Sequence, residues 1–207
     1  MRFQRSRAAV LGAAVVTLAL TACAPTGQPA NPGVAASYHD RSVTNSTIDG
    51  IYQAWVDDTK GQDVANRREI LTVELLRDDL LAKCKELGYP VPWATAKSYA
   101  NSWINFKGLT GGASDEMISA TQGILALYVV AYTDPTLASL KEISEKVEKS
   151  AVVSPRSGVY STDALLSTVQ TAMKSADQQQ LGPQFSFTEM QNVSAFADAN
   201  VSWFDRG

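Results

Sequence analysis

The sequence has few of the side chains on which most enzymes depend. Its 207 residues include one histidine, His39, and two cysteines, Cys23 and Cys84. Catalysis of the Ser-His-Asp or Cys-His type would need His39, which lies before the predicted helices, and no histidine follows Cys84. His39 has no cluster of Cys, Asp or Glu at ligand spacing, so we expect it in a surface loop and expect no metal site. The sequence therefore predicts a protein that is not an enzyme and that uses no cofactor.

The amino end lacks an apolar run long enough to cross a membrane. The run from Ala8 to Leu20 has 13 residues, whereas a membrane-spanning helix needs about 20. Arg2, Arg5 and Arg7 precede it. Positive charges followed by a short apolar run are typical of an export signal, which we place at residues 1–22.

A short motif ends this run. Leu20, Thr21, Ala22 and Cys23 follow one another and resemble the bacterial lipobox, in which the cysteine receives the lipid. The resemblance implies that Cys23 is the first mature residue and bears several acyl chains, which suffice for stable anchoring. We therefore predict a lipoprotein held by the lipid bilayer on the extracytoplasmic face of the cell membrane. The alternative is a plain secretory signal that happens to precede a cysteine.

Clusters of positive charge are absent from the rest of the chain. Because Arg2, Arg5 and Arg7 would be removed with the signal, 15 basic residues would remain against 21 acidic ones, a net charge of about −6. This balance argues against nucleic acid as a partner.

With Cys23 acylated, Cys84 would be the one free thiol of the chain, so no internal disulfide is expected. It falls on the apolar side of a predicted helix and is interpreted as a small buried hydrophobe.

Residues 23–40 read as a flexible tether between lipid and domain. Ala24 to Ala36 is rich in proline, glycine and small residues and shows no hydrophobic periodicity.

Two pairs of adjacent acidic residues, Asp57-Asp58 and Asp78-Asp79, occur in predicted helices. Neighbouring residues diverge around a helix, so we expect solvated surface there instead of an acid/base pair.

The hydrophobic periodicity beyond the tether predicts a mostly helical bundle of five to seven helices. The central helix covers 67–87 and is closed by Gly88; apolar residues recur along one side at helical spacing. The other predicted helices start near Ile48, Ala94, Asp115, Pro135 and Thr162. A small two-stranded sheet could join the ends of the bundle, with Val152-Val153 pairing the segment 42–44.

The segment after the fifth helix carries a family resemblance. It keeps Val153, Pro155, Arg156, Gly158 and Tyr160. These positions resemble a V-N-P-R-aromatic-G-x-aromatic motif of actinobacterial lipoproteins related to the amino-terminal domain of the chaperone SurA. The sequence departs from that motif by having serine at positions 154 and 157. Residues 42–91 look similar to the same family in their order of a short strand and two helices.

The resemblance implies a helical domain over residues 41–160 without the family's prolyl isomerase module. Only 61 residues separate Val91 from Val153, too few for an inserted module of about a hundred. Residues 161–207 depart from the family and are expected to form a further helix and an aromatic tail, both packed on the bundle. That tail contains Phe185, Phe187, Phe196, Trp203 and Phe204.

Four aromatic residues allow two interpretations. Trp93, Tyr99, Trp103 and Phe106 belong to the third predicted helix and form either ordinary core or the wall of a groove for apolar peptide. The groove interpretation favours a non-enzymatic holdase for secreted or envelope polypeptides. The alternative is a structural lipoprotein that binds a fixed partner of the cell envelope. The sequence does not predict an oligomeric state.

Overall fold

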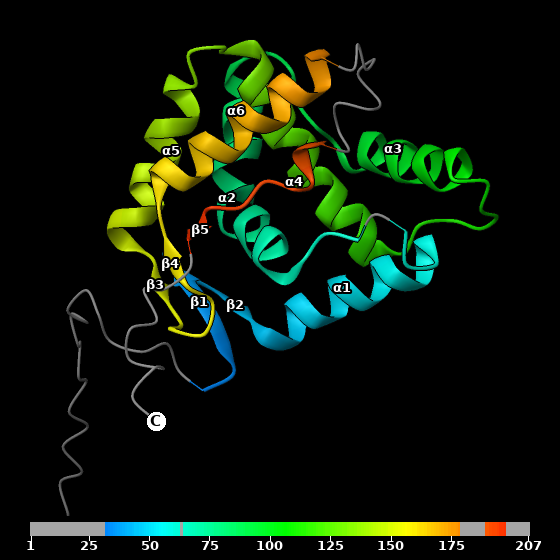
Figure 1. Ribbon diagram of the computed structural model, residues 1–207, viewed down its shortest axis with the longest axis horizontal. Coiled ribbons are helices and arrows are strands. Elements are labelled where there is room, and N and C mark those ends of the chain that lie inside the picture. Colours follow the sequence, from blue (N-terminus) through cyan, green and yellow to red (C-terminus); the bar gives the residue numbers. More distant parts are fainter. Residues whose placement is uncertain (1–31, 63, 179–188, 198–207) are drawn as a thin grey trace, which may run out of the picture.

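The structure, a computed structural model, describes residues 32–62, 64–178 and 189–197. It is mostly helical, as the sequence predicts (Figure 1). The helices are α1 (Asn45–Thr59), α2 (Arg67–Glu86), α3 (Trp93–Phe106), α4 (Asp115–Thr133), α5 (Ala138–Ser150) and α6 (Thr162–Gln178). The strands are β1 (Val34–Tyr38), β2 (Arg41–Thr44), β3 (Val152–Val153), β4 (Val159–Tyr160) and β5 (Phe196–Ala197).

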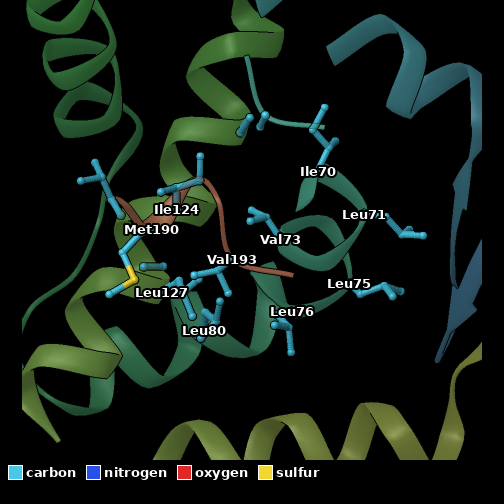
Figure 2. Packing of buried hydrophobic residues seen from close by; sticks show 14 of the residues in the cluster. Ile70, Leu71, Val73, Leu75, Leu76, Leu80, Ile124, Leu127, Met190 and Val193 are labelled. Atoms are coloured by element: carbon cyan, nitrogen blue, oxygen red, sulfur yellow. The ribbon is translucent and has the colours of Figure 1, made fainter. Parts of the chain in front are cut away.

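Helix α2 lies at the centre of the fold, as predicted. Asn66 begins it with a capping box, in which its side chain accepts hydrogen bonds from the helix and Glu69 bonds back to its amide. Every residue from Ile70 to Leu76 is buried, because α1, α4, α5 and the strands surround this part of the helix. Figure 2 shows Val73 and Leu80 beside Leu127 of α4 and Val193 of the segment after residue 188, whereas Leu71 and Leu75 point to the opposite side of the helix. One apolar face was predicted, but the middle of the helix is covered on all sides.

Glu74 is the buried acid of this helix. Its carboxylate lies 3.2 Å from the guanidinium of Arg77, which also bonds the hydroxyl of Ser119 on α4. Burial raises the pKa of Glu74, while the charges of Arg77 and Arg41 lower it. Arg41 of β2 also donates to the Glu74 carbonyl. The polar cluster of Arg41, Glu74, Arg77 and Ser119 therefore connects the first sheet with α2 and α4.

The tether predicted for residues 23–40 ends too late. Residues 34–38 form β1, the middle strand of a three-stranded sheet of order β2-β1-β3, and Ala35 and Ala36 are buried. His39 occupies the exposed turn between β1 and β2 with a φ of 51°. The small side chains that suggest a linker are instead those that fit a strand packed close to helix α2.

The sequence predicted that Val152-Val153 pairs with residues 42–44, and this prediction is wrong, because Val152-Val153 pairs with another strand. β3 pairs with β1, through Ala36 with Val153 and Ser37 with Val152, and β1 separates it from β2. Both segments do belong to one sheet, which joins the start of the domain to its later part. A second sheet pairs β4 with β5.

Two helices begin at other residues than predicted. Helix α1 starts at Asn45, three residues before Ile48, because Thr44 serves as its cap. Pro135 is not in the first turn of α5, which starts at Ala138. Asp134 still caps that helix from a distance, since its carboxylate accepts the amide of Ser139 at 2.9 Å.

The described part of the carboxyl-terminal segment is core. Met190, Val193 and Ala195 are fully buried, and the Ala195 amide donates to the hydroxyl of Thr72 on α2 at 2.9 Å. Phe196 of β5 packs edge-on against Tyr160, with ring centroids 5.6 Å apart. The segment 189–197 therefore crosses the middle of the bundle (red in Figure 1). Phe185, Phe187, Trp203 and Phe204 lie outside the described residues.

The export signal and the lipobox lie outside the described residues as well. Within residues 32–62, 64–178 and 189–197, no helix is both long and apolar enough to span a membrane.

The crossing of α2 and α4 gives a testable prediction. A Cβ added at Gly123 on α4 would overlap Cγ1 of Val73 on α2. We expect Gly123→Ala to lower the free energy of unfolding by about 1–3 kcal/mol, because a packed core accommodates one extra carbon poorly. Urea unfolding of the purified chain measures the change.

Gly50 is the matched control for this substitution. It lies inside α1, and nothing stands within 4 Å of an added Cβ. Gly50→Ala should therefore stabilise the protein by about 0.5–1 kcal/mol. Combining Gly123→Ala with Val73→Ala should cost less than the two single changes together. Equal effects at both glycines would show that the two helices do not cross as closely as described.

Candidate functional site

An uncharged groove lies between α3, α4 and the loop that follows α2. Its volume is about 340 Å³, within the usual range of about 300–1,000 Å³ for ligand sites. Among the described residues that line it, none is charged, so an apolar ligand could enter without burying a charge among them. The lining residues, which we call the tyrosine groove, are Gly88, Tyr89, Pro90, Val91, Thr95, Tyr99, Leu125, Tyr128 and Val129.

The end of α2 positions one wall of the tyrosine groove. Gly88 adopts a φ of 82°, and the Tyr89 amide donates to the Cys84 carbonyl at 2.9 Å. This is a Schellman ending, which turns the chain sharply away from the helix. Gln122 of α4 donates to the Val91 carbonyl at 2.9 Å and holds the far end of the loop. The wall is therefore fixed at both ends.

Helix α4 forms the floor with residues one helical turn apart. Leu125, Tyr128 and Val129 face α3, and Tyr99 comes from that helix. The Tyr128 ring also packs against the Tyr132 ring in a tilted arrangement, at a centroid distance of 4.4 Å. Partial burial raises the pKa of Tyr128, and the neighbouring tyrosines raise it further. These rings present flat apolar faces beside hydroxyl groups, a combination that suits polypeptide chains.

The predicted aromatic quartet does not form one wall. Of its members, Tyr99 alone lines the groove. Trp103 is 7% exposed and belongs to the core, where Lys107 lies over its ring at 4.5 Å. Trp93 and Phe106 are 42% and 58% exposed. The core interpretation therefore holds for Trp103, Tyr99 lines a groove, and Trp93 and Phe106 belong to neither.

Exposed aromatic surface concentrates beside the groove. Four large apolar side chains are exposed among the described residues, and three of them, Tyr89, Trp93 and Phe106, fall on α3 or the loop before it. Tyr89 is 60% exposed and is part of the groove. Single exposed apolar residues are ordinary, whereas contiguous apolar patches mark interaction surfaces. Trp93 begins α3 beside the loop of the groove, and Phe106 lies at the other end of that helix. Figure 1 shows α3 on the outer side of α4.

Sequence reasoning missed Tyr89, Leu125, Tyr128 and Val129 as groove residues. Helical periodicity assigned the residues of α4 to the core because that helix is apolar nearly all round. A usable signal was the Pro90 to Pro92 segment, which must leave the helical path and so opens space beside the next helix.

The segment from Val153 to Tyr160, for which the sequence predicts a family resemblance, forms a turn between two strands. Pro155 and Arg156 are exposed between β3 and β4. Gly158 has a φ of 101°, and an added Cβ would lie 2.7 Å from the Ala197 carbonyl oxygen. Glycine is therefore required at this position for two reasons: the positive φ of the backbone and the short distance to β5. Val153 pairs in the first sheet, so the turn connects both sheets.

Tyr160 ends this motif inside the protein. Its ring is buried, and its hydroxyl shares a hydrogen bond of 3.0 Å with the hydroxyl of Ser144 on α5. Burial raises the pKa of Tyr160. The serines that replace the motif's usual residues bond the first strand: the Ser154 amide donates to the Ala35 carbonyl at 2.8 Å. The motif is thus structural, apart from its exposed arginine.

Other candidate groups have structural roles. Cys84 is buried beside the Ala126 carbonyl, and burial raises its pKa to about 11, which confirms the interpretation as a small hydrophobe. Asp58 and Asp79 are not simply solvated as predicted. Asp58 accepts both the amide and the hydroxyl of Ser114 at the start of α4, and Asp79 accepts the hydroxyl of Tyr38. Within the described ranges, no group of three His, Cys, Asp or Glu residues could hold a metal ion.

Comparisons of this chain with models of protein families, with curated proteins and with solved structures found no match.

Proposed function

We propose that this protein is a lipid-anchored, non-enzymatic holdase that shields unfolded polypeptides outside the cytoplasm. The tyrosine groove receives an extended apolar segment of the client. The observation that supports this most is the position of Tyr89, a 60% exposed ring in the lining of a groove whose described residues carry no charge.

The chemistry of the groove favours weak and unselective binding. Tyrosine faces and aliphatic side chains attract apolar segments of many sequences through buried area alone. The groove offers few polar groups, so it imposes little specificity on a client. A holdase needs this property, because its clients share exposed apolar surface and no common sequence. Chain release then follows when the client buries the same residues in its own core.

Two features of the sequence support the proposed location at the membrane and the proposed class of protein, a chaperone. The lipobox at Leu20 to Cys23 would place the domain at the membrane surface, close to where exported chains emerge. The motif from Val153 to Tyr160 resembles chaperone-related lipoproteins, and the chain from Val91 to Val153 leaves no room for an isomerase module. The proposed activity is therefore shielding without acceleration of proline isomerisation.

An aggregation assay tests this proposal. The unlipidated chain should slow aggregation of several unrelated unfolding clients at near-stoichiometric ratios, while the isomerisation rate of a proline peptide stays unchanged. Tyr89→Ser should weaken the shielding, because it removes an exposed ring that lines the groove. Its thermal midpoint should hardly change, since exposed side chains contribute within about 0.5 kcal/mol to stability.

Phe106→Ser is the matched control. Phe106 is as exposed as Tyr89 but lies outside the groove lining. A variant at this position should keep most of the shielding. If both variants lose activity equally, general surface hydrophobicity is responsible and the groove is not. If the intact chain protects none of the clients, the holdase proposal fails and a scaffold with one fixed envelope partner replaces it.

A further inference from the structure

The lining of the tyrosine groove carries hydroxyl groups that can bond a ligand. They belong to Tyr89, Thr95 and Tyr128. Within the described part of the chain, none of these three hydroxyls has a hydrogen-bond partner. Each can donate one hydrogen bond. The groove therefore offers donors, set among flat aromatic faces, to a ligand that brings acceptors.

Strong acceptors for a client's own N–H groups are scarce in the same lining. None of the described lining residues has a carboxylate or an amide side chain. The Val91 carbonyl already accepts the side-chain amide of Gln122 at 2.9 Å. A client N–H that is buried without an acceptor loses its hydrogen bond to water at a cost in free energy. Because proline has no N–H, a proline-rich segment avoids this cost.

The backbone of a proline-rich segment also matches the donors of the groove. Such a segment adopts the extended polyproline II helix, which has no internal hydrogen bonds, so its carbonyls remain available as acceptors. It is stiff before binding and loses less conformational entropy than a flexible chain does. Aromatic-lined grooves recognise polyproline II segments for these reasons. Charge is complementary as well, since proline and the described lining residues are all uncharged.

We propose that the tyrosine groove preferentially binds uncharged, proline-rich segments of client polypeptides in the polyproline II conformation. The inference rests on the proposed holdase function and adds the class of segment that is held. The rings of Tyr89 and Tyr128 pack against proline rings, and the hydroxyls of the lining donate to the carbonyls between them. The preference concerns the backbone of the client. Side chains between the prolines stay unselected, as a holdase with many clients requires.

Two matched peptides test the preference. Both are uncharged, of equal length and blocked at their ends. The first repeats Leu-Pro-Ser-Pro, and in the second alanine replaces every proline. Each is titrated by calorimetry into the chain from residue 23 onward, with Cys23→Ser. We expect the proline peptide to bind at least about ten-fold more tightly, because each alanine brings an N–H that the groove leaves without an acceptor.

Variants of the chain locate the binding site. Tyr89→Phe keeps the exposed ring and removes its hydroxyl, so it should bind the proline peptide about two- to ten-fold more weakly, the effect of one neutral hydrogen bond. Tyr89→Ser removes the ring as well and should weaken binding further. Val159→Ser is the control: Val159 is 57% exposed on β4, on the other side of the molecule from α3 (Figure 1). It should bind within about two-fold of the parent. Circular dichroism checks that all three variants are folded.

Two results would overturn the preference for proline. Equal affinity for the two peptides would show that the groove does not distinguish their backbones. Binding of the proline peptide that Tyr89→Ser leaves unchanged would place its site outside the tyrosine groove. The holdase function is tested separately by the aggregation assay. A chain that shields clients but binds both peptides equally refutes this inference alone, whereas a chain that shields no client refutes the proposed function.

Discussion

Cells that express Cys23→Ser should release the protein from the membrane fraction or retain it as an uncleaved precursor. The proposed lipobox makes Cys23 the acylated residue, and several acyl chains hold a protein far more firmly than any contact of the folded domain can. Labelled fatty acid should therefore be absent from the variant and present in the parent. The expected loss of membrane association is complete.

Cys84→Ala is the control for this experiment. Cys84 is the other cysteine of the chain and is buried beside α4, so it should receive no lipid. Its variant should incorporate label like the parent. Equal labelling of the parent and Cys23→Ser would rule out the lipobox and, with it, the proposed location at the membrane.

Trp103→Ala should give the largest loss of stability among the aromatic variants. Trp103 is 7% exposed, stacks on Phe106 at a centroid distance of 5.9 Å and fills the space between α3 and the core. Removal of a buried tryptophan costs about 3–5 kcal/mol, because the apolar area is lost and a cavity is left. Thermal unfolding followed by circular dichroism measures this cost as a lower midpoint.

Trp93 provides a comparison on the same helix. It is 42% exposed, so Trp93→Ala should change stability by about 0.5 kcal/mol or less. The protein that remains folded in Trp103→Ala should still shield clients at low temperature, since Trp103 does not line the tyrosine groove. Loss of shielding with an unchanged midpoint would place Trp103 in the binding surface and contradict its position in the core.

Helix positions were largely predictable because their signals are local. Ser114 caps α4 and Gly88 follows the end of α2, as the sequence indicates. Such signals act over one helical turn and do not depend on the rest of the chain. The same cause explains the misplaced start of α1: Thr44, Asn45 and Ser46 are all able to cap, and the tertiary structure selects Thr44.

Strand β1 and the groove were not predictable in the same way. Ala35 and Ala36 belong to a strand that pairs with β2 on one side and with β3, more than a hundred residues later, on the other. The local sequence, rich in small residues, favours a linker. The groove depends on Tyr89 and Tyr128 meeting across a loop and a helix. Hydrophobic periodicity shows which side of a helix is apolar. It does not show where the apolar sides of two helices leave a groove between them instead of packing together.

The chain enters the domain through a strand that has neighbours on both sides. A force pulling on Gly33 loads the pairs of β1 with β2, the pairs of β1 with β3 and the bond from Asn45 at the same time. An edge strand would instead be peeled away one bond after another. If Cys23 is acylated as proposed, tension from the lipid is therefore borne by the sheet. The walls of the tyrosine groove belong to α3, α4 and the loop after α2, so they keep their shape while the attachment is under tension.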